Sequence, residues 1–253
     1  MFLILPLINT PTEDIALPYI CCMNSPQSLL FVLATAAEAC CLGVDKSLKP
    51  GFYLNHLGDG FSLLITGVGQ VPTAYHLSKT FTENKFTAAI NLGVAGALDL
   101  EIPLGTLVNI IRDEFADLGA ENGDEFLSLF NLELANANEN PFSNSKLFPI
   151  LFPFGEMGVQ VKNIRSVTGA SVNTVHGASA SIMAFQKRND AQIESMEGAA
   201  FFYACNMANV PSLQIRSISN YVEPRNRNNW RMDLALESLL IFIQVNFPGF
   251  KKF

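Results

Sequence analysis

A carboxylate and an amide, Glu197 and Asn220, lie 23 residues apart in a stretch that could form a ligand site. The carboxylate can accept hydrogen bonds from vicinal hydroxyl groups, whereas the amide can both donate and accept. The first belongs to the motif Glu194-Ser-Met-Glu-Gly-Ala-Ala200 and the second to Arg216-Ser-Ile-Ser-Asn220. A sugar contact and a base contact are the chemistry that this pair favours, with the Arg216 guanidinium between them.

Two predicted elements must position these side chains. Residues 196–207 are rich in alanine and aromatic residues and contain no proline, which predicts a buried helix with Glu197 in its first turn. The helix dipole stabilises an ionised carboxylate at that position. Residues 211–218 are short, mostly apolar and partly β-branched, which predicts a strand covered on both faces.

Ligands of α/β proteins bind at the carboxyl ends of the strands. Arg216, Ser219 and Asn220 would then lie at the mouth of a cleft near Glu197. Taken singly, Glu197 could instead cap its own helix, and Asn220 could close a turn. The two residues together, with Arg216 between them, favour a site.

A further carboxylate, Glu38, follows the predicted first strand. The apolar run 28–35 has the length of a strand, and residues 36–42 favour a helix that begins just before Glu38. On its own, such a glutamate is explained by its favourable interaction with the helix dipole.

Two glycine-rich turns follow further predicted strands. One, at residues 67–72, comes after the strand 61–66, and the other, at residues 93–96, ends a strand that begins at Ala88. Glycines let the backbone pass close to a ligand, and the amides at a helix start favour an anion. The chain contains no arginine before Arg112, however, which disfavours a phosphate site at these turns.

Together these motifs resemble the purine nucleosidase and nucleoside phosphorylase superfamily, in which a Met-Glu-(Gly/Ala)-(Ala/Thr)-Ala helix and an Arg-x-Ile-Ser-(Asp/Asn) strand end form the nucleoside pocket. Within it they are most similar to the futalosine hydrolase family. The resemblance covers roughly residues 29–243 and leaves the first 27 residues outside it. It extends to three further stretches, 115–121, 126–129 and 219–225, and to Trp230 and Arg231.

The resemblance implies how the N-glycosidic bond of a purine nucleoside would be cleaved. This reaction builds positive charge on the ribose and negative charge on the departing base. Glu38 would act as the general base on water, with Arg216 assisting its orientation. Glu197 would hold the 2′ and 3′ hydroxyls, and Asn220 would contact the base. Further substrate contacts are expected from Met196, Val94, Ala95, Gly96, Ser219, Phe115 and the base-stacking candidates Val172, Asn173 and Thr174.

The resemblance also implies a homodimer in which the acidic loop 113–126 lies near the neighbouring active site. Phe115 and Phe126 could cover the 5′ side of the sugar, or they could fill a local cavity beneath the loop. No cofactor and no metal is required. His176 is expected to cap or pack at its loop, because no serine or cysteine of nucleophile type accompanies it.

Asn220 bears on the identity of the base. An amide cannot supply a proton, but it can donate to O6 of a 6-oxopurine and bond to N7, which suits hypoxanthine. The expected reaction is hydrolysis of futalosine to hypoxanthine and dehypoxanthinyl futalosine, in menaquinone biosynthesis. A methylthioadenosine or aminofutalosine nucleosidase, a purine nucleoside phosphorylase and a non-catalytic nucleoside-binding protein remain the alternatives.

Composition sets wider bounds on the protein. A net charge of −7 argues against nucleic acid as a partner, and a 49% hydrophobic content can form a large core. The five cysteines lack metal-binding spacing and are interpreted as reduced thiols. The apolar start is too short to span a membrane and has no basic segment of a signal peptide, so a cytoplasmic protein is expected.

Alternating strands and helices predict the fold. We expect a three-layer α/β/α domain around a mixed, twisted sheet, comprising residues 28–253, with residues 1–27 as an extension packed on it. Apolar residues at helical spacing predict a last helix over residues 229–245 that packs on the sheet.

Overall fold

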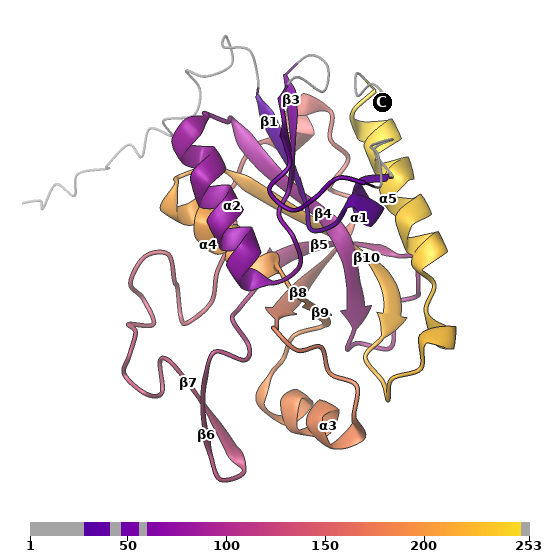
Figure 1. The fold of residues 1–253 in the computed structure, drawn as a ribbon. Helices are drawn as coiled ribbons and strands as arrows, with labels where there is room; N and C mark the ends of the chain where they lie inside the picture. The colour runs from indigo at the N-terminus through magenta and orange to yellow at the C-terminus, as the bar shows by residue number, and fades with distance from the viewer. Residues whose placement is uncertain (1–27, 41–46, 56–59, 249–253) are drawn as a thin grey trace, which may run out of the picture.

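The computed structural model describes residues 28–40, 47–55 and 60–248 (Figure 1). The predicted N-terminal extension, residues 1–27, lies outside the described residues. The strands are β1 (Leu29–Leu33), β2 (Tyr53–Leu54), β3 (Phe61–Ile65), β4 (Ala88–Ala97), β5 (Leu107–Arg112), β6 (Gly119–Asn122), β7 (Glu125–Ser128), β8 (Arg165–Ser171), β9 (Ile193–Ser195) and β10 (Ser212–Tyr221). The helices are α1 (Ala36–Ala39), α2 (Gln70–Glu83), α3 (Ser179–Arg188), α4 (Gly198–Met207) and α5 (Met232–Asn246), with short 3-10 turns η3 (Phe154–Met157) and η4 (Arg227–Asn229).

The main sheet is mixed, as the sequence predicts. Its strands lie in the order β10-β5-β8-β9-β4-β1-β3-β2, and β10 pairs with β4 as well as with β5. Most neighbouring pairs are parallel, whereas β10 with β5, β4 with β9 and β2 with β3 are antiparallel. The extra pairing makes β4, β10, β5, β8 and β9 a closed ring, so this half of the sheet curls around on itself.

Helices cover the sheet on both faces, which confirms the three-layer prediction. Leu29, Phe31 and Leu33 of β1 belong to the core cluster that contains Phe242 and Ile243 of α5. The alternate residues of β1, Leu30 and Val32, belong instead to the cluster formed with α2 and α4. Successive side chains of a strand point to opposite faces, so both faces of β1 are apolar because both are covered.

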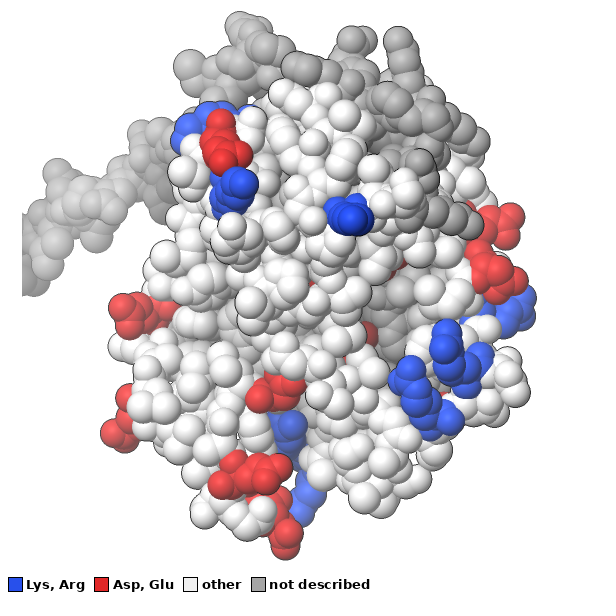
Figure 2. Space-filling model, viewed as in Figure 1, with Lys and Arg blue, Asp and Glu red and all other residues white. Residues whose placement is uncertain are grey.

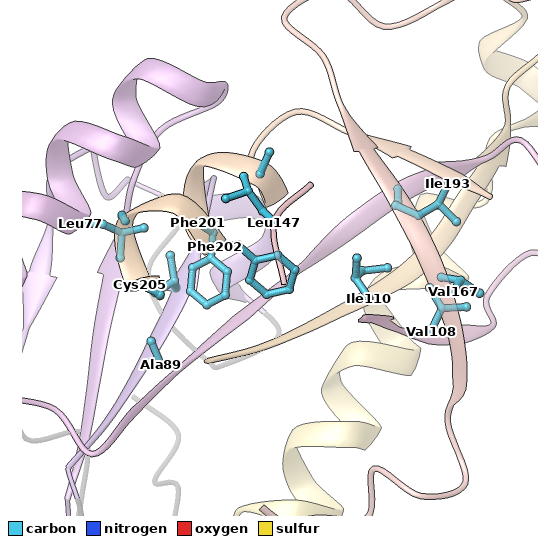
Figure 3. Packing of buried hydrophobic residues seen from close by; sticks show 14 of the residues in the cluster. Leu77, Ala89, Val108, Ile110, Leu147, Val167, Ile193, Phe201, Phe202 and Cys205 are labelled. Carbon is cyan, nitrogen blue, oxygen red and sulfur yellow. The ribbon is translucent and has the colours of Figure 1, made fainter. Parts of the chain in front are cut away.

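The layer formed by α2 and α4 is packed with aromatic side chains. Phe201, Phe202 and Cys205 of α4 lie with Leu77 of α2 in one cluster against the sheet (Figure 3). Each of these four side chains is 0% exposed. Full burial of a large apolar side chain contributes about 1.5 to 3 kcal/mol to the free energy of unfolding. This packing fixes α4, and with it Glu197 at the start of the helix.

Several element boundaries differ from the sequence prediction. Helix α2 begins at Gln70, within the predicted glycine-rich turn 67–72, because a proline in the first turn lacks only an N–H that would have no partner within the helix. The loop after Asp113 contains the hairpin β6–β7, whose turn holds Gly123 at a φ of +63°. Asn122-Gly123 is a common hairpin turn signal, and it was missed. Strand β9 has only three residues, too few for a periodicity to show.

Candidate functional site

The predicted site residues converge at the carboxyl ends of the central strands. Glu38 follows β1, Gly69 follows β3, Gly93 to Gly96 lie in the last part of β4, and Asn220 lies near the end of β10. Glu197 stands between β9 and α4. The surface is hollowed near the middle of the face shown in Figure 2, and acidic atoms are visible inside the hollow. Ligands of α/β sheets bind at this edge.

Glu38 is held in place by a reciprocal helix cap. Thr35 accepts a hydrogen bond from the Glu38 amide at 3.1 Å, and Glu38 Oε2 accepts from the Thr35 amide at 3.0 Å and from its hydroxyl at 2.9 Å. This capping box fixes the side chain in one orientation. The other oxygen, Oε1, accepts from the Val94 amide at 3.2 Å. Glu38 is thus both part of the helix cap, through Oε2, and the catalytic candidate.

Arg216 approaches the same carboxylate across Gly93. Arg216 of β10 and Gly93 of β4 are partners in the strand register. A methyl group at Gly93 would lie 2.3 Å from Arg216 Nη1 and 2.9 Å from Glu38 Oε1, so only a glycine fits between the guanidinium and the carboxylate. Arg216 is 1% exposed and donates from Nη2 to Asn91 Oδ1. The buried Arg216 guanidinium therefore lies beside the Glu38 carboxylate.

Glu197 precedes α4 rather than lying in its first turn, and its side chain does not cap the helix. Its Oε1 accepts instead from the Gly69 amide at 2.9 Å, at the start of α2, where Gly69 has a φ of +98°. Burial raises the pKa of Glu197, Arg216 opposes that shift, and the nearby Glu38 adds to it. The three charged side chains therefore form one electrostatic group.

Asn220 is oriented by its neighbours in β10. Its Oδ1 accepts from the Ser219 hydroxyl at 2.8 Å, and its Nδ2 donates to the Tyr221 carbonyl at 2.9 Å. Asn220 is the register partner of Gly96, and a methyl group at Gly96 would lie 3.2 Å from its Nδ2. The Asn220 side-chain amide thus lies over Gly96 of β4. Asn220 itself is inside strand β10 rather than in a turn.

A pocket adjoins Asn220 and includes two residues whose place in the site the sequence reasoning missed. His176 Nδ1 pairs with Glu194 Oε2, and the His176 amide donates to Glu194 Oε1 at 3.0 Å. Glu194 lies in the short strand β9, which was not predicted, and His176 was expected only to pack. A charged residue two positions before Met196 is the signal that could have indicated a second polar group. The pocket is lined by Gly96, Val175, His176, Glu194, Asn220, Tyr221, Val222, Glu223, Arg225 and Trp230.

The base-stacking candidates lie outside the lining of this pocket. Val172 is 0% exposed and belongs to a core cluster with Phe185 of α3. Asn173 is exposed and bonds to Asp117, and Thr174 is exposed. Their segment contributes Val175 and His176 to the pocket instead.

The remaining candidates are placed as follows. Phe115 packs against Phe142 and Tyr203, with ring centroids 6.4 Å and 5.9 Å away, which corresponds to the cavity-filling interpretation. Met196 is half-buried beside Glu197, and Ala95 is buried with its carbonyl accepting from Ser219 at 3.3 Å. The structure thus brings Glu38, Arg216, Glu197 and the last part of β4 together, with Asn220 on the neighbouring part of the same sheet edge; residues 93–96, predicted as a turn, continue the strand because they pair with β10.

The chain is similar in sequence to known proteins. The family model described as the phosphorylase superfamily matches residues 50–242. The chain belongs to this superfamily. Two curated relatives, both futalosine hydrolases, are similar over most of their length. That of Streptomyces coelicolor is 30% identical over 197 residues, covering 76% of this chain and 80% of the relative. That of Thermus thermophilus is 31% identical over 182 residues, covering 72% of this chain and 79% of the relative.

Solved structures agree with the phosphorylase superfamily fold. Futalosine hydrolase of Helicobacter pylori matches with a TM-score of 0.69 at 16% identity, covering 88% of this chain and 98% of the other. The 5′-methylthioadenosine/S-adenosylhomocysteine nucleosidase of Neisseria meningitidis, solved with methylthio-immucillin-A, matches with a TM-score of 0.66 at 15% identity, covering 87% and 99%. These likenesses show that the fold is shared.

Within residues 28–40, 47–55 and 60–248, no helix is long and apolar enough to cross a membrane. The same part of the chain holds no group of three or more histidine, cysteine, aspartate or glutamate side chains placed to bind a metal ion.

A buried carboxylate behind the site leads to a prediction about stability. Asp113 is 0% exposed and accepts hydrogen bonds from Gln214 Nε2, the Glu114 amide and the Ser171 hydroxyl at 2.8 to 3.0 Å. Burial raises its pKa from 3.8 to about 6, although these bonds oppose the shift. A carboxyl group whose pKa is raised by folding stabilises the protein below its unfolded pKa. That contribution is lost as the pH rises through the folded pKa.

Asp113→Asn should therefore gain stability relative to the wild type between pH 4 and pH 7. The relative gain in the free energy of unfolding is about 3 kcal/mol, from a pKa difference of roughly two units. Gln214 Oε1, which has no hydrogen-bond partner among the described residues, can accept from the new amide. Urea unfolding at the two pH values measures the difference, with the exposed hairpin residue Asp124→Asn as control. Parallel pH profiles for Asp113→Asn and wild type would contradict the assignment.

Proposed function

We propose that this protein is a futalosine hydrolase, which uses water to cleave the N-glycosidic bond of futalosine and releases hypoxanthine and dehypoxanthinyl futalosine in menaquinone biosynthesis. The observation that carries the proposal is the meeting of Glu38 and Arg216 across Gly93 beside the Val94 amide. This arrangement can hold and deprotonate a water molecule. The names and coverage of the curated relatives support the same reaction.

The charge distribution suits a reaction that separates charge along the glycosidic bond. Glu38 and Glu197 provide negative charge where the ribose becomes positive, and Asn220 provides a hydrogen-bond donor where the base becomes negative. Glu38 activates water, Arg216 orients that water, and Glu197 accepts from the ribose hydroxyls. Val94, Ala95 and Gly96 supply the backbone along the sugar, beside Met196 and Ser219.

Hydrolysis is favoured over phosphorolysis by the contact that Gly69 makes. The turn after β3 offers the amide that an anion at the start of α2 would use, but that amide already donates to Glu197 at 2.9 Å. A phosphate bound there would also meet the Glu197 carboxylate. An attacking water molecule needs neither this amide nor a cluster of arginines.

Assembly as a homodimer forms part of the proposal. Large apolar side chains are exposed around the start of α2, with Val71 at 77% and Tyr75 at 62%. Gln70 of this helix lies 3.5 Å from Asp117 of the loop 113–126, so the helix and the loop adjoin. A second copy packed here would cover this apolar surface beside the active site. Sedimentation equilibrium measures the mass in solution, and a monomer at micromolar concentration would contradict the assembly.

One assay tests the reaction. The protein is incubated with futalosine, aminofutalosine, inosine and methylthioadenosine, each with and without phosphate, and the free base is measured. We expect hypoxanthine from futalosine at a rate that phosphate does not change. Strict dependence on phosphate would indicate a phosphorylase, release of adenine alone an aminopurine nucleosidase, and binding without turnover a nucleoside-binding protein.

Asn220→Asp should shift the preference toward 6-aminopurine nucleosides. An aspartate can accept from a 6-amino group and pass a proton to N7, whereas Asn220 can donate to O6. A buried polar mismatch of this kind is worth about 1 to 3 kcal/mol, so the ratio of kcat/KM for aminofutalosine to that for futalosine should rise at least about fivefold. Competition between the two substrates measures this ratio. An unchanged ratio in a folded variant would exclude Asn220 as the base-selecting residue.

A further inference from the structure

The leaving base needs a proton that Asn220 cannot supply. When the glycosidic bond breaks, its electron pair stays on the purine, and protonation of that purine makes it a better leaving group. An asparagine amide donates a hydrogen bond but does not titrate in this way. The polar side chains that line the pocket beside Asn220 are therefore the candidates for a proton donor.

Strand register places one of these groups opposite Asn220. Gly96 of β4 pairs with Glu194 of β9 on one side and with Asn220 of β10 on the other. Cross-strand partners point to the same face of a sheet, and neighbouring strands are about 4.8 Å apart. Glu194 and Asn220 therefore rise from the same face on opposite sides of a residue that has no side chain. The floor of the pocket is open because Gly96 lies between them.

Glu194 holds His176 in place at this pocket. Both oxygens of Glu194, which is 4% exposed, are directed at His176, one to the ring Nδ1 and one to the backbone amide. The imidazole packs against the Phe185 ring with a centroid distance of 4.5 Å. These contacts fix the ring and leave Nε2 without a hydrogen-bond partner among the described residues. His176 lines the pocket, so Nε2 remains for a ligand.

We propose that His176 is a catalytic residue that donates the proton to the departing purine, and that Glu194 is a positioning residue that holds the imidazole. This inference rests on the proposed function. The bond from C1′ to the purine breaks, its electron pair goes to the purine, and the Nε2 proton of the imidazolium neutralises it. Water attacks C1′ and loses its proton to Glu38. That proton returns through solvent to His176, so one water molecule is consumed.

Other charged groups surround the imidazole and enter the pH dependence. Glu194 faces it from β9, and Glu223, Arg225 and Tyr221 line the same pocket from the chain at and after the end of β10. Two carboxylates and one guanidinium leave a local excess of negative charge.

His176→Gln tests the inference, because glutamine keeps a hydrogen-bond donor but cannot transfer a proton near neutral pH. We expect kcat for futalosine to fall about 10²- to 10³-fold, within the usual contribution of a general acid. We also expect the decline in rate at high pH, where the imidazole loses its proton, to disappear. His76→Gln, on helix α2 and outside the pocket, is the matched control and should change kcat less than twofold.

Glu194→Gln separates proton transfer from a merely structural role, and it provides the test if His176→Gln does not fold. Loss of the carboxylate charge should move the alkaline decline in kcat to lower pH, which a packing role would not do. A kcat for His176→Gln within threefold of the wild type overturns the inference. A large loss with an unchanged alkaline decline in both variants also overturns it. A wild type that releases no base from futalosine overturns the proposed function itself, which is a separate result.

Discussion

Glu38→Gln should lower kcat for futalosine hydrolysis by about 10³-fold, within the range usual for loss of a general base, and should leave KM within about threefold. A glutamine side chain has the same size, and its oxygen can still accept from Thr35 in the helix cap. It cannot take the proton of the attacking water. The loss should therefore fall on the chemical step and spare substrate binding, as single-turnover measurements would show.

Glu83→Gln is the matched control for this variant. Glu83 is an exposed glutamate at the end of α2, so its replacement removes a negative charge without touching the cleft. Thermal unfolding should leave the Tm of Glu83→Gln close to that of the wild type and lower that of Glu38→Gln moderately, because the new side-chain NH2 cannot accept from the Val94 N–H. A kcat for Glu38→Gln within tenfold of the wild type would mean that another group activates the water.

The sequence indicates which polar groups lie at the carboxyl ends of buried apolar strands. Glu38 and Asn220 follow or end apolar runs, and the rule that ligands bind at the carboxyl ends of strands brings them to one edge. The same rule places Gly96 there. The motifs could not predict the distances between these groups. The fit of Glu38 and Arg216 around Gly93, for example, depends on the register of β4 with β10.

The His176–Glu194 pair shows why the rest of the site escaped prediction. Glu194 lies in a strand of three residues, and His176 lies in a loop, so neither position has a periodicity that indicates its neighbours. Their meeting requires β9 to pair antiparallel with β4, which is a long-range feature of the closed ring of strands. Local patterns determine the elements, whereas contacts of this kind depend on how the sheet closes.

The hairpin β6–β7 and the start of α2 were missed for a different reason. Their signals were present, as Asn122-Gly123 and as a proline that a first helical turn accepts. The fold class did not depend on either element, because the layers come from the buried strands and from α2, α4 and α5.

Gly93→Ala should lower kcat about 10²-fold without removing any functional group. The backbone of Gly93 lies within β4, where alanine is allowed, so the obstacle is space rather than conformation. The added methyl group would lie 2.3 Å from Arg216 Nη1 and 2.9 Å from Glu38 Oε1, so both groups must move. Misplacement of catalytic groups by about 1 Å can lower a rate by about 10²-fold.

Stability should fall as well, because Arg216 is fully buried and has little room to move. Overpacking of this kind costs about 1 to 3 kcal/mol in the free energy of unfolding. Gly155→Ala is the matched control, since a methyl group there meets nothing within 4 Å, and both its activity and its stability should be those of the wild type. Measured under conditions where Gly93→Ala is fully folded, a wild-type kcat would show that catalysis tolerates displacement of Glu38 and Arg216. That result would contradict the proposed mechanism, which depends on the placement of Glu38 and Arg216 around Gly93.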